Sequence, residues 1–206
     1  IGGLAVAVPG ESAGLLMLHR RWGRLPLFEV AQPAIELARD GFEVGAHLAK
    51  ALDALGPDAA TLSQGLFDTP NVPSAGDVVT RAKLAKTIEG WASSKVNPLQ
   101  KGPIAKDIAR AAQSSGGILT KDDLADYRPK ERTPIVGRYR GWQVVTMPPP
   151  SSGGAVLLQV LGALESSDLT QLGSQSAAYY HRLAEAMKHA FADRARLMGD
   201  PDRVDV

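Results

Sequence analysis

A run of three prolines between a strand pattern and a helix pattern constrains the fold of this chain most strongly. Proline has no N–H group to offer a β-ladder, so Pro148–Pro150 must end any strand that reaches them. Gly137 and Gly141 interrupt the preceding stretch as a turn would. The strand-forming residues there are Ile135, Val136, Tyr139, Trp142, Val144 and Val145. The sequence therefore predicts an antiparallel strand pair around residues 134–147, followed by a rigid elbow.

A helix is expected directly after the elbow. Leu157, Leu158, Leu161 and Leu164 recur at helical spacing. Ser151 or Ser152 can cap this helix, and the free N–H groups of a helix start can also bind an anion. Capping and anion binding both fit the pattern. Ser151 and Ser152 are therefore candidates for either role.

The rest of the chain has mostly helical periodicity. Helices are expected at residues 12–22, 28–39, 45–55, 83–92, 103–115 and 175–198. Pro33 predicts a break or a start within the second of these, and Thr120 to Asp123 form a capping-box pattern. Residues 56–77 hold glycines and prolines with little periodicity, which predicts an irregular excursion. The predicted fold class is α+β, mainly helical with one short antiparallel strand pair.

The first eight residues form an apolar run that predicts a strand. A chain that opens inside a buried strand pattern is expected to be a piece of a larger protein. The helix that follows should carry its apolar face on Leu15, Leu18 and Trp22, while the helix at residues 175–198 should turn Tyr180, Met187 and Phe191 inward.

Charge and composition exclude several classes of function. The 23 basic and 22 acidic residues are spread along the chain, and no basic stripe argues for a nucleic-acid partner. The absence of cysteine excludes disulfides and thiolate metal sites. Asp122, Asp123, Asp200 and Asp202 are explained by capping and turns, so no metal and no cofactor is predicted. The apolar runs are too short for a membrane span.

A Gly-x-Ser-x-Gly motif at Gly10–Gly14 raises the alternative of a serine esterase with Ser12 as nucleophile. That chemistry needs an acid and a loop histidine later in the chain, but His181 and His189 lie within a helical pattern. Helices also follow one another up to about residue 134, whereas the esterase fold alternates strands with helices. We therefore expect Ser12 to be a helix N-cap. No complete catalytic constellation is found in the chain.

Ten short stretches, in this order, resemble the large subunit of the gamma-glutamyltranspeptidase family. The stretches occur in the family's order and span almost the whole chain. They are Val8–Gly14, Gly23–Pro26, Gln32–Phe42, Gly116–Tyr127, Arg132–Pro134, Tyr139–Gly141, Met147–Gly154, Glu185–Lys188, Ala192–Arg194 and Gly199–Pro201. The resemblance implies that residues 1–206 are a partial large-subunit region. By their matched position within Met147–Gly154, it also makes Ser151 and Ser152 candidate substrate-binding residues in a wall near the catalytic cleft.

The resemblance implies an N-terminal-nucleophile hydrolase fold, a four-layer α/β/β/α sandwich. Such a precursor cuts itself before a threonine, whose hydroxyl then attacks the gamma-glutamyl amide of glutathione or a relative, with its own α-amino group as base. The gamma-glutamyl group passes to water, an amino acid or a peptide. The implied partners are the small catalytic subunit and a gamma-glutamyl substrate, in the periplasm or outside the cell, with no cofactor.

No catalytic residue of the family can be placed on this sequence. The family's nucleophile belongs to a threonine-rich motif that is not found here, and the arginine that binds the donor carboxylate belongs to a segment before Ile1. Three interpretations remain: a piece of a gamma-glutamyltranspeptidase, an esterase that uses Ser12, and a non-catalytic assembly fragment that needs a partner chain to cover its sheet. The first and third are compatible. We expect the 206-residue chain alone to be inactive.

Overall fold

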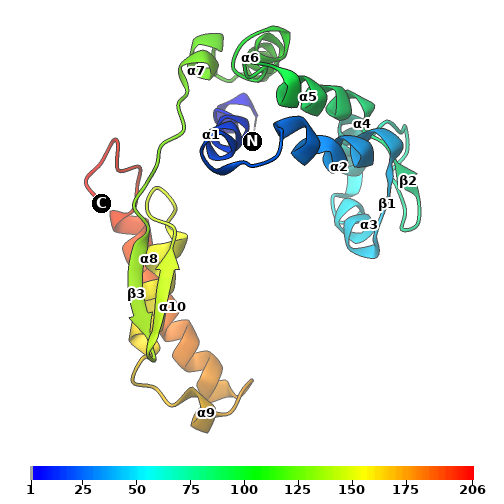
Figure 1. Ribbon diagram of the computed structural model, residues 1–206. Coiled ribbons are helices and arrows are strands. Elements are labelled where there is room, and N and C mark those ends of the chain that lie inside the picture. Colours follow the sequence, from blue (N-terminus) through cyan, green and yellow to red (C-terminus); the bar gives the residue numbers. More distant parts are fainter. Residues whose placement is uncertain (1) are drawn as a thin grey trace. The chain divides into compact units, whose positions relative to one another are not determined.

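The computed structural model describes residues 2–206, which form two compact units, the first ending at Lys130 and the second running from Glu131 to Val206. The chain is mainly helical (Figure 1). The first unit contains a 3-10 turn, η1, at Gly3–Ala5 and another, η2, at Gly56–Asp58. Its helices are α1 Glu11–Trp22, α2 Leu27–Asp40, α3 Ala46–Asp53, α4 Ala59–Leu66, α5 Ala82–Ser93, α6 Pro103–Ser114 and α7 Lys121–Asp126. Its two strands, β1 Phe42–Glu43 and β2 Val78–Val79, pair antiparallel.

Helix α2 packs along α5 in the first unit (Figure 1). The contact face of α2 buries Ala31, Ile35 and Ala38, and α5 contributes Ala85. Small alanine side chains allow the two helices to approach closely. The expected break at Pro33 is wrong, because α2 runs through it. Proline removes one backbone hydrogen bond there, and we attribute the continuity of the helix to burial of its apolar face on both sides of Pro33.

Residues 56–77 do not form the irregular excursion that the sequence predicts. They begin with η2 and α4, and α4 buries Ala59 and Ser63. The helix has only eight residues, which is too short for a clear periodic signal next to glycine and proline. Irregular backbone is confined to residues 67–77.

That loop is closed at its base by Asp68. The Asp68 N–H donates to the Thr80 carbonyl at 2.9 Å, and the Asp68 carboxylate accepts from the Ala82 N–H at 2.5 Å. Beside it, a cluster of buried side chains surrounds the short strand pair: Val44, Leu52, Phe67 and Val79. The loop therefore begins and ends at one fixed point next to a packed core.

A second cluster of the first unit lies on α6 and α7 and consists of Ala105, Ala109, Ala112, Leu119 and Leu124. The predicted strand at residues 1–8 is wrong for the described part: Gly3–Ala5 form η1 against α6, and Ile1 lies outside the described residues. The Gly3 N–H donates to the Ser115 carbonyl at 2.8 Å, and a Cβ at Gly3 would lie 2.2 Å from the Ala112 carbonyl. Backbone approaches backbone here, which only glycine permits.

The capping box of α7 forms as expected. The Asp123 N–H donates to the Thr120 hydroxyl at 3.1 Å, and the Thr120 N–H donates to the Asp123 carboxylate at 2.8 Å. Hydrogen bonds from the Thr120 hydroxyl and N–H stabilise the charged carboxylate and lower the pKa of Asp123 below its ordinary value of 3.8.

The second unit is a hairpin covered by helices. Strands β3 Ile135–Tyr139 and β4 Trp142–Thr146 pair antiparallel, which confirms the predicted strand pair. Helix α8, Gly153–Leu164, lies on the hairpin, and α10, Ala177–Leu197, packs on α8 (Figure 1). A short helix, α9 Leu169–Leu172, connects α8 to α10. The predicted order of strand, elbow and helix is therefore confirmed, and the mainly helical class with it; the pair β1–β2 was not predicted.

A glycine lets the start of α8 touch β4. A Cβ on Gly154 would lie 2.1 Å from the Met147 carbonyl oxygen and 2.9 Å from Cγ2 of Thr146. Backbone atoms cannot move aside as the end of a long side chain can. The elbow thus folds back on the strand only because residue 154 has no side chain.

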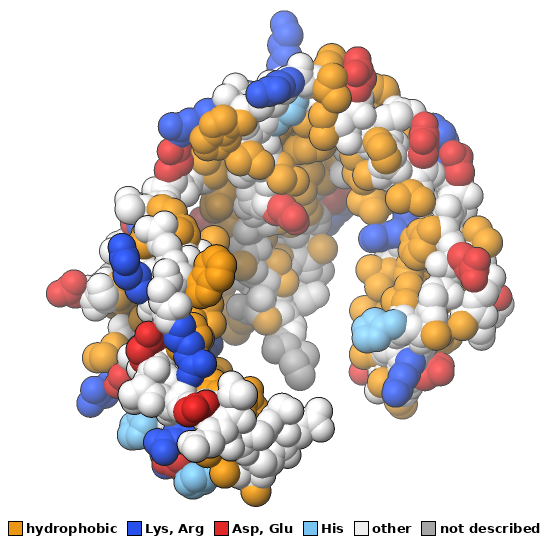
Figure 2. All heavy atoms as spheres, turned by 60° about the horizontal axis from the view of Figure 1, so that its bottom comes forward, with side chains coloured by type: hydrophobic (Ala, Val, Ile, Leu, Met, Phe, Trp, Pro, Cys, Tyr) orange, Lys and Arg blue, Asp and Glu red, His pale blue; other side chains and the backbone are white. Residues whose placement is uncertain are grey.

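Much apolar surface of the second unit is uncovered. Val136 and Val145 are cross-strand partners on the outer face of the hairpin and are 56% and 59% exposed. On α10 the expected inward residues Tyr180, Met187 and Phe191 are exposed, and the buried residues are Ala186 and Ala190. Figure 2 shows hydrophobic side chains at the surface. The expectation that these three large side chains are buried on α10 is therefore wrong within the described residues.

We expect Gly154→Ala to lower the free energy of unfolding of the second unit by about 1–3 kcal/mol, the usual cost of forcing atoms into a packed contact. Gly162→Ala is the matched control in the same helix, because nothing lies within 4 Å of its Cβ position. That change should stabilise the helix by about 0.5–1 kcal/mol. Urea unfolding followed by circular dichroism measures both. Equal effects of the two substitutions would contradict the close contact at residue 154.

Candidate functional site

Ser12 lies in the first turn of α1, but it is not the N-cap that the sequence predicts. The N-cap position belongs to Gly10, whose lack of a side chain leaves the cap without a side-chain hydrogen bond. The Ser12 hydroxyl instead accepts from the Asn97 side-chain amide at 2.9 Å, and its carbonyl accepts from the Trp91 indole N–H at 3.3 Å. Ser12 therefore links α1 to α5 and to the segment that follows it.

The geometry gives Ser12 no activating base. In residues 2–206, none of the described hydrogen bonds joins the Ser12 hydroxyl to a histidine or a carboxylate. His19, on the same helix, uses a ring nitrogen to bond the Leu25 carbonyl at 2.8 Å. A serine hydroxyl is a poor nucleophile unless a neighbouring base takes its proton. The arrangement around Ser12 is therefore structural.

The two glycines of the motif differ in what they do. A Cβ on Gly10 would lie 2.3 Å from the ring of Tyr127, so the absence of a side chain lets this tyrosine pack on the start of α1. Nothing lies within 4 Å of the Cβ position of Gly14. Packing alone thus explains the first glycine, without a nucleophile elbow.

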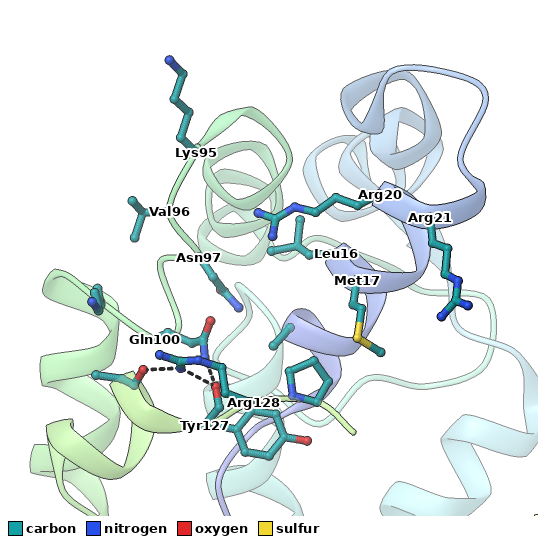
Figure 3. Close-up of a pocket in the computed structure, with 14 residues that line it drawn as sticks. Leu16, Met17, Arg20, Arg21, Lys95, Val96, Asn97, Gln100, Tyr127 and Arg128 are labelled. Carbon is teal, nitrogen blue, oxygen red and sulfur yellow. Dashed lines mark hydrogen bonds between the residues drawn. The ribbon is translucent and has the colours of Figure 1, made fainter. Parts of the chain in front are cut away.

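Two cavities lie beside α1. An apolar groove of about 750 Å³ runs between α1, α2 and α5, and Ser12, Trp22 and Trp91 are among its lining residues. A second pocket, of about 620 Å³, is lined from α1, from the segment between α5 and α6, and from the end of α7 (Figure 3). Asn97 lines this second pocket, so the Ser12–Asn97 hydrogen bond joins residues of the two cavities.

At the elbow, Ser152 occupies the N-cap of α8 but does not cap it with its side chain. Its hydroxyl accepts from Nε of Arg194 on α10 at 2.7 Å. The Ser151 hydroxyl accepts from the Gly153 N–H at 3.4 Å. The sequence predicts no role for Arg194 beyond its place in the family-like stretch Ala192–Arg194. Its contact with Ser152 joins residues 42 positions apart, so no short stretch of sequence indicates it. The helix start therefore has a serine and a guanidinium side by side.

Three of the four aspartates considered as metal ligands have other partners. Asp202 binds Arg132 at 2.5 Å, and Asp200 lies 3.9 Å from the same guanidinium. Asp123 belongs to the capping box. A search of residues 2–206 finds no group of three or more histidine or acidic side chains placed to hold a metal ion. None of the helices in that range is long and apolar enough to cross a membrane.

Known proteins resemble this chain along its whole length. A family model described as Gamma-glutamyltranspeptidase matches residues 1–206. The chain is 44% identical to a glutathione hydrolase proenzyme of Escherichia coli (strain K12), over 98% of the chain and 36% of the relative. It is 37% identical to a glutathione hydrolase proenzyme of Bacillus subtilis (strain 168), over 99% of the chain and 35% of that relative. An Acylase ACY 1 proenzyme of Pseudomonas sp. (strain SE83) is also 37% identical, over 100% of the chain and 38% of that relative.

Solved structures show the same fold. The gamma-glutamyltranspeptidase of Helicobacter pylori matches with a TM-score of 0.86 and 35% identity, over 100% of this chain and 60% of that one. The gamma-glutamyltranspeptidase of Pseudomonas nitroreducens, complexed with L-DON, matches with a TM-score of 0.87 and 36% identity, over 100% and 62%. The curated relatives named above are longer still, and the chain spans little more than a third of their length.

A double-mutant cycle tests the structural role of Ser12. We expect Ser12→Ala to leave the buried Asn97 amide without a partner and to lower the free energy of unfolding by about 1–3 kcal/mol. The coupling energy with Asn97→Ala, from urea unfolding of both single variants and the double variant, should be about 0.5–1.5 kcal/mol.

Ser114→Ala is the control, because its exposed hydroxyl bonds only within α6. A fluorophosphonate probe should leave Ser12 unlabelled. Labelling at Ser12, or a coupling energy of zero, would contradict the structural assignment.

Proposed function

Because the chain belongs to the gamma-glutamyltranspeptidase family, we propose that it is a large-subunit portion of an enzyme that cleaves gamma-glutamyl amides. The substrates of this enzyme are glutathione and related compounds, and the gamma-glutamyl group passes to water, an amino acid or a peptide. The observation that carries the proposal is the family match over all 206 residues, together with 44% identity to a glutathione hydrolase proenzyme.

The nucleophile we propose is a threonine outside this chain, freed when the precursor cuts itself. Its α-amino group takes the hydroxyl proton, and the hydroxyl oxygen attacks the gamma-glutamyl carbonyl. Backbone N–H groups aimed at the developing oxyanion stabilise the tetrahedral intermediate. The Ser12 geometry supports this division, because the one serine in a nucleophile-like motif has no base. The chain then supplies scaffold, and its catalytic partner is the small subunit of the same precursor.

The hairpin of the second unit supports a place in the α/β/β/α sandwich. Two strands alone are marginally stable, and further strands or a second layer are needed to cover the outer face. Val136 and Val145 form an exposed apolar pair on that face, while α8 and α10 lie on the opposite side. In the proposal, α8 and α10 are outer helices and the rest of the protein covers the outer face. A periplasmic or secreted location is proposed from the family alone.

An acylase is the second candidate, because the chain is as similar to an acylase proenzyme as to the Bacillus subtilis glutathione hydrolase. The higher identity to the Escherichia coli enzyme favours the glutathione hydrolase. The two candidates differ in the donor that the enzyme accepts. A gamma-glutamyl anilide and an acyl anilide without the α-amino group separate them directly.

The complete encoded protein tests this proposal. We expect a threonine-led segment to follow Val206 and the purified precursor to cleave itself immediately before that threonine, giving two chains on a denaturing gel. The processed protein should hydrolyse a gamma-glutamyl anilide, and a threonine-to-alanine variant should remain uncleaved. The 206-residue chain alone should show no hydrolysis, because the proposed nucleophile is not part of it. Turnover by that chain alone, or a following segment without such a threonine, would contradict the proposal.

We propose further that Ser151 and Ser152 shape a wall of the donor site, with Arg194 holding Ser152 in place. In the processed enzyme, Ser152→Ala should raise the KM for the donor roughly three- to tenfold, the effect of about 0.7–1.4 kcal/mol of lost binding. Gln159→Ala is the control, because its amide bonds Asp193 across the same pair of helices at 3.0 Å. If Ser151→Ala and Ser152→Ala both leave donor kinetics and stability unchanged, this role is excluded.

A further inference from the structure

The pocket drawn in Figure 3 has a charge composition unlike that of the whole chain. Basic and acidic residues are nearly balanced overall, 23 against 22. The lining of this cavity, by contrast, includes five positively charged side chains and no carboxylate: Arg20, Arg21, Lys95, Lys101 and Arg128. A concave site with one sign of charge raises the local concentration of ions of opposite sign. No carboxylate of the pocket lining balances this excess of positive charge.

Two of these cations face the hollow. In Figure 3 the guanidinium groups of Arg20 and Arg128 extend toward Asn97 and Gln100, whereas Lys95 and Arg21 point away from them. Arg21 stacks over the Trp22 ring at 4.7 Å. Within residues 2–206, Arg20 has no ion pair or side-chain hydrogen bond. The donors available to a ligand are thus those of Arg20 and the outer nitrogens of Arg128.

Backbone carbonyls hold Arg128 in this position. Its Nη1 donates to the Ala125 carbonyl at 2.7 Å and to the Tyr127 carbonyl at 2.8 Å. Both bonds use the same nitrogen, so Nε and Nη2 keep their N–H groups for another acceptor. A guanidinium fixed before binding loses less entropy when it binds.

The floor of the pocket is rigid and carries no competing acid. Gln100 donates to the Tyr127 carbonyl at 2.7 Å, and Asn97, 7% exposed, donates to Ser12 and accepts from the Leu99 N–H at 3.1 Å. Apolar side chains form the remaining wall: Leu16, Met17, Val96 and Pro129. A volume of about 620 Å³ lies within the range of small-molecule sites.

We infer that this pocket binds a small organic anion, whose carboxylate or phosphate group lies between Arg20 and Arg128 and whose apolar body contacts Leu16, Met17 and Val96. The planar fork of a guanidinium matches both oxyanions with paired N–H···O bonds, which a lysine cannot reproduce. The inference does not depend on the proposed catalytic activity, because every residue used lies in the first unit of this chain.

Isothermal titration of the complete protein that carries this chain tests the site with two probes, pyrophosphate and succinate. We expect saturable binding of at least one of them, weakened at least tenfold by Arg20→Gln and by Arg128→Gln. Arg20→Lys keeps the charge but loses the fork, so its affinity should lie between those of the wild type and Arg20→Gln. Arg24→Gln removes a cation that lies four positions after Arg20 in the sequence and does not line the pocket, so it should change the affinity less than twofold.

The pattern of results separates the alternatives. Binding of pyrophosphate alone identifies a phosphate ester as the ligand class, and binding of succinate alone identifies a carboxylic acid. Both results support the site. Absence of saturable binding of either probe up to about 10 mM would overturn the inference, since that limit corresponds to less than about 3 kcal/mol of affinity. So would an equal loss on Arg24→Gln, which would indicate general attraction to positive charge. Circular dichroism checks that each variant is folded.

Discussion

A two-stranded sheet has two faces and two edges, and one helical layer can cover only one face. This constraint governs the second unit. Helix α8 covers the inner face, and the absence of a side chain at Gly154 lets it begin directly against β4. The outer face keeps Val136 and Val145 exposed. An uncovered apolar face is expected of a hairpin that belongs to a larger sheet. The chain spans 36% of the length of the Escherichia coli relative.

The first unit solves the packing problem in a different way. Its helices approach one another over alanines, as where α2 meets α5, and its N-terminal turn meets α6 backbone to backbone at Gly3. The apolar groove and the basic pocket described above lie beside α1.

The sequence predicted those features of the fold that neighbouring residues determine by themselves. Proline cannot join a ladder, so the end of β4 and the start of α8 were visible, as was the capping box at Thr120. The eight-residue helix α4 and the two-residue strands β1 and β2 are shorter than a periodic pattern needs. On α10 the residues expected inward are exposed, because periodicity alone does not reveal what covers a helix face.

Long-range pairings explain the remaining failures. Ser12 bonds Asn97 across 85 residues, and the basic pocket joins Arg20 to Arg128, so neither arrangement has a signal in any short stretch. The family resemblance did not predict either arrangement, because it matches positions along the chain and not contacts between distant residues. The sequence motif at Ser12 suggested chemistry, and only the geometry around its hydroxyl shows that it is a structural link.

Asp68 has a consequence for how the chain tolerates change. Its N–H group and its carboxylate hydrogen-bond Thr80 and Ala82, so they hold the two ends of the segment between Asp68 and Ala82 together. The outer part of that segment is not needed to keep these ends in place. The entropy of closing a loop grows only slowly with its length. Extra residues near Pro70 or Asn71 would lengthen a segment already anchored at both ends, which makes this position suitable for inserting an epitope or a fluorescent label.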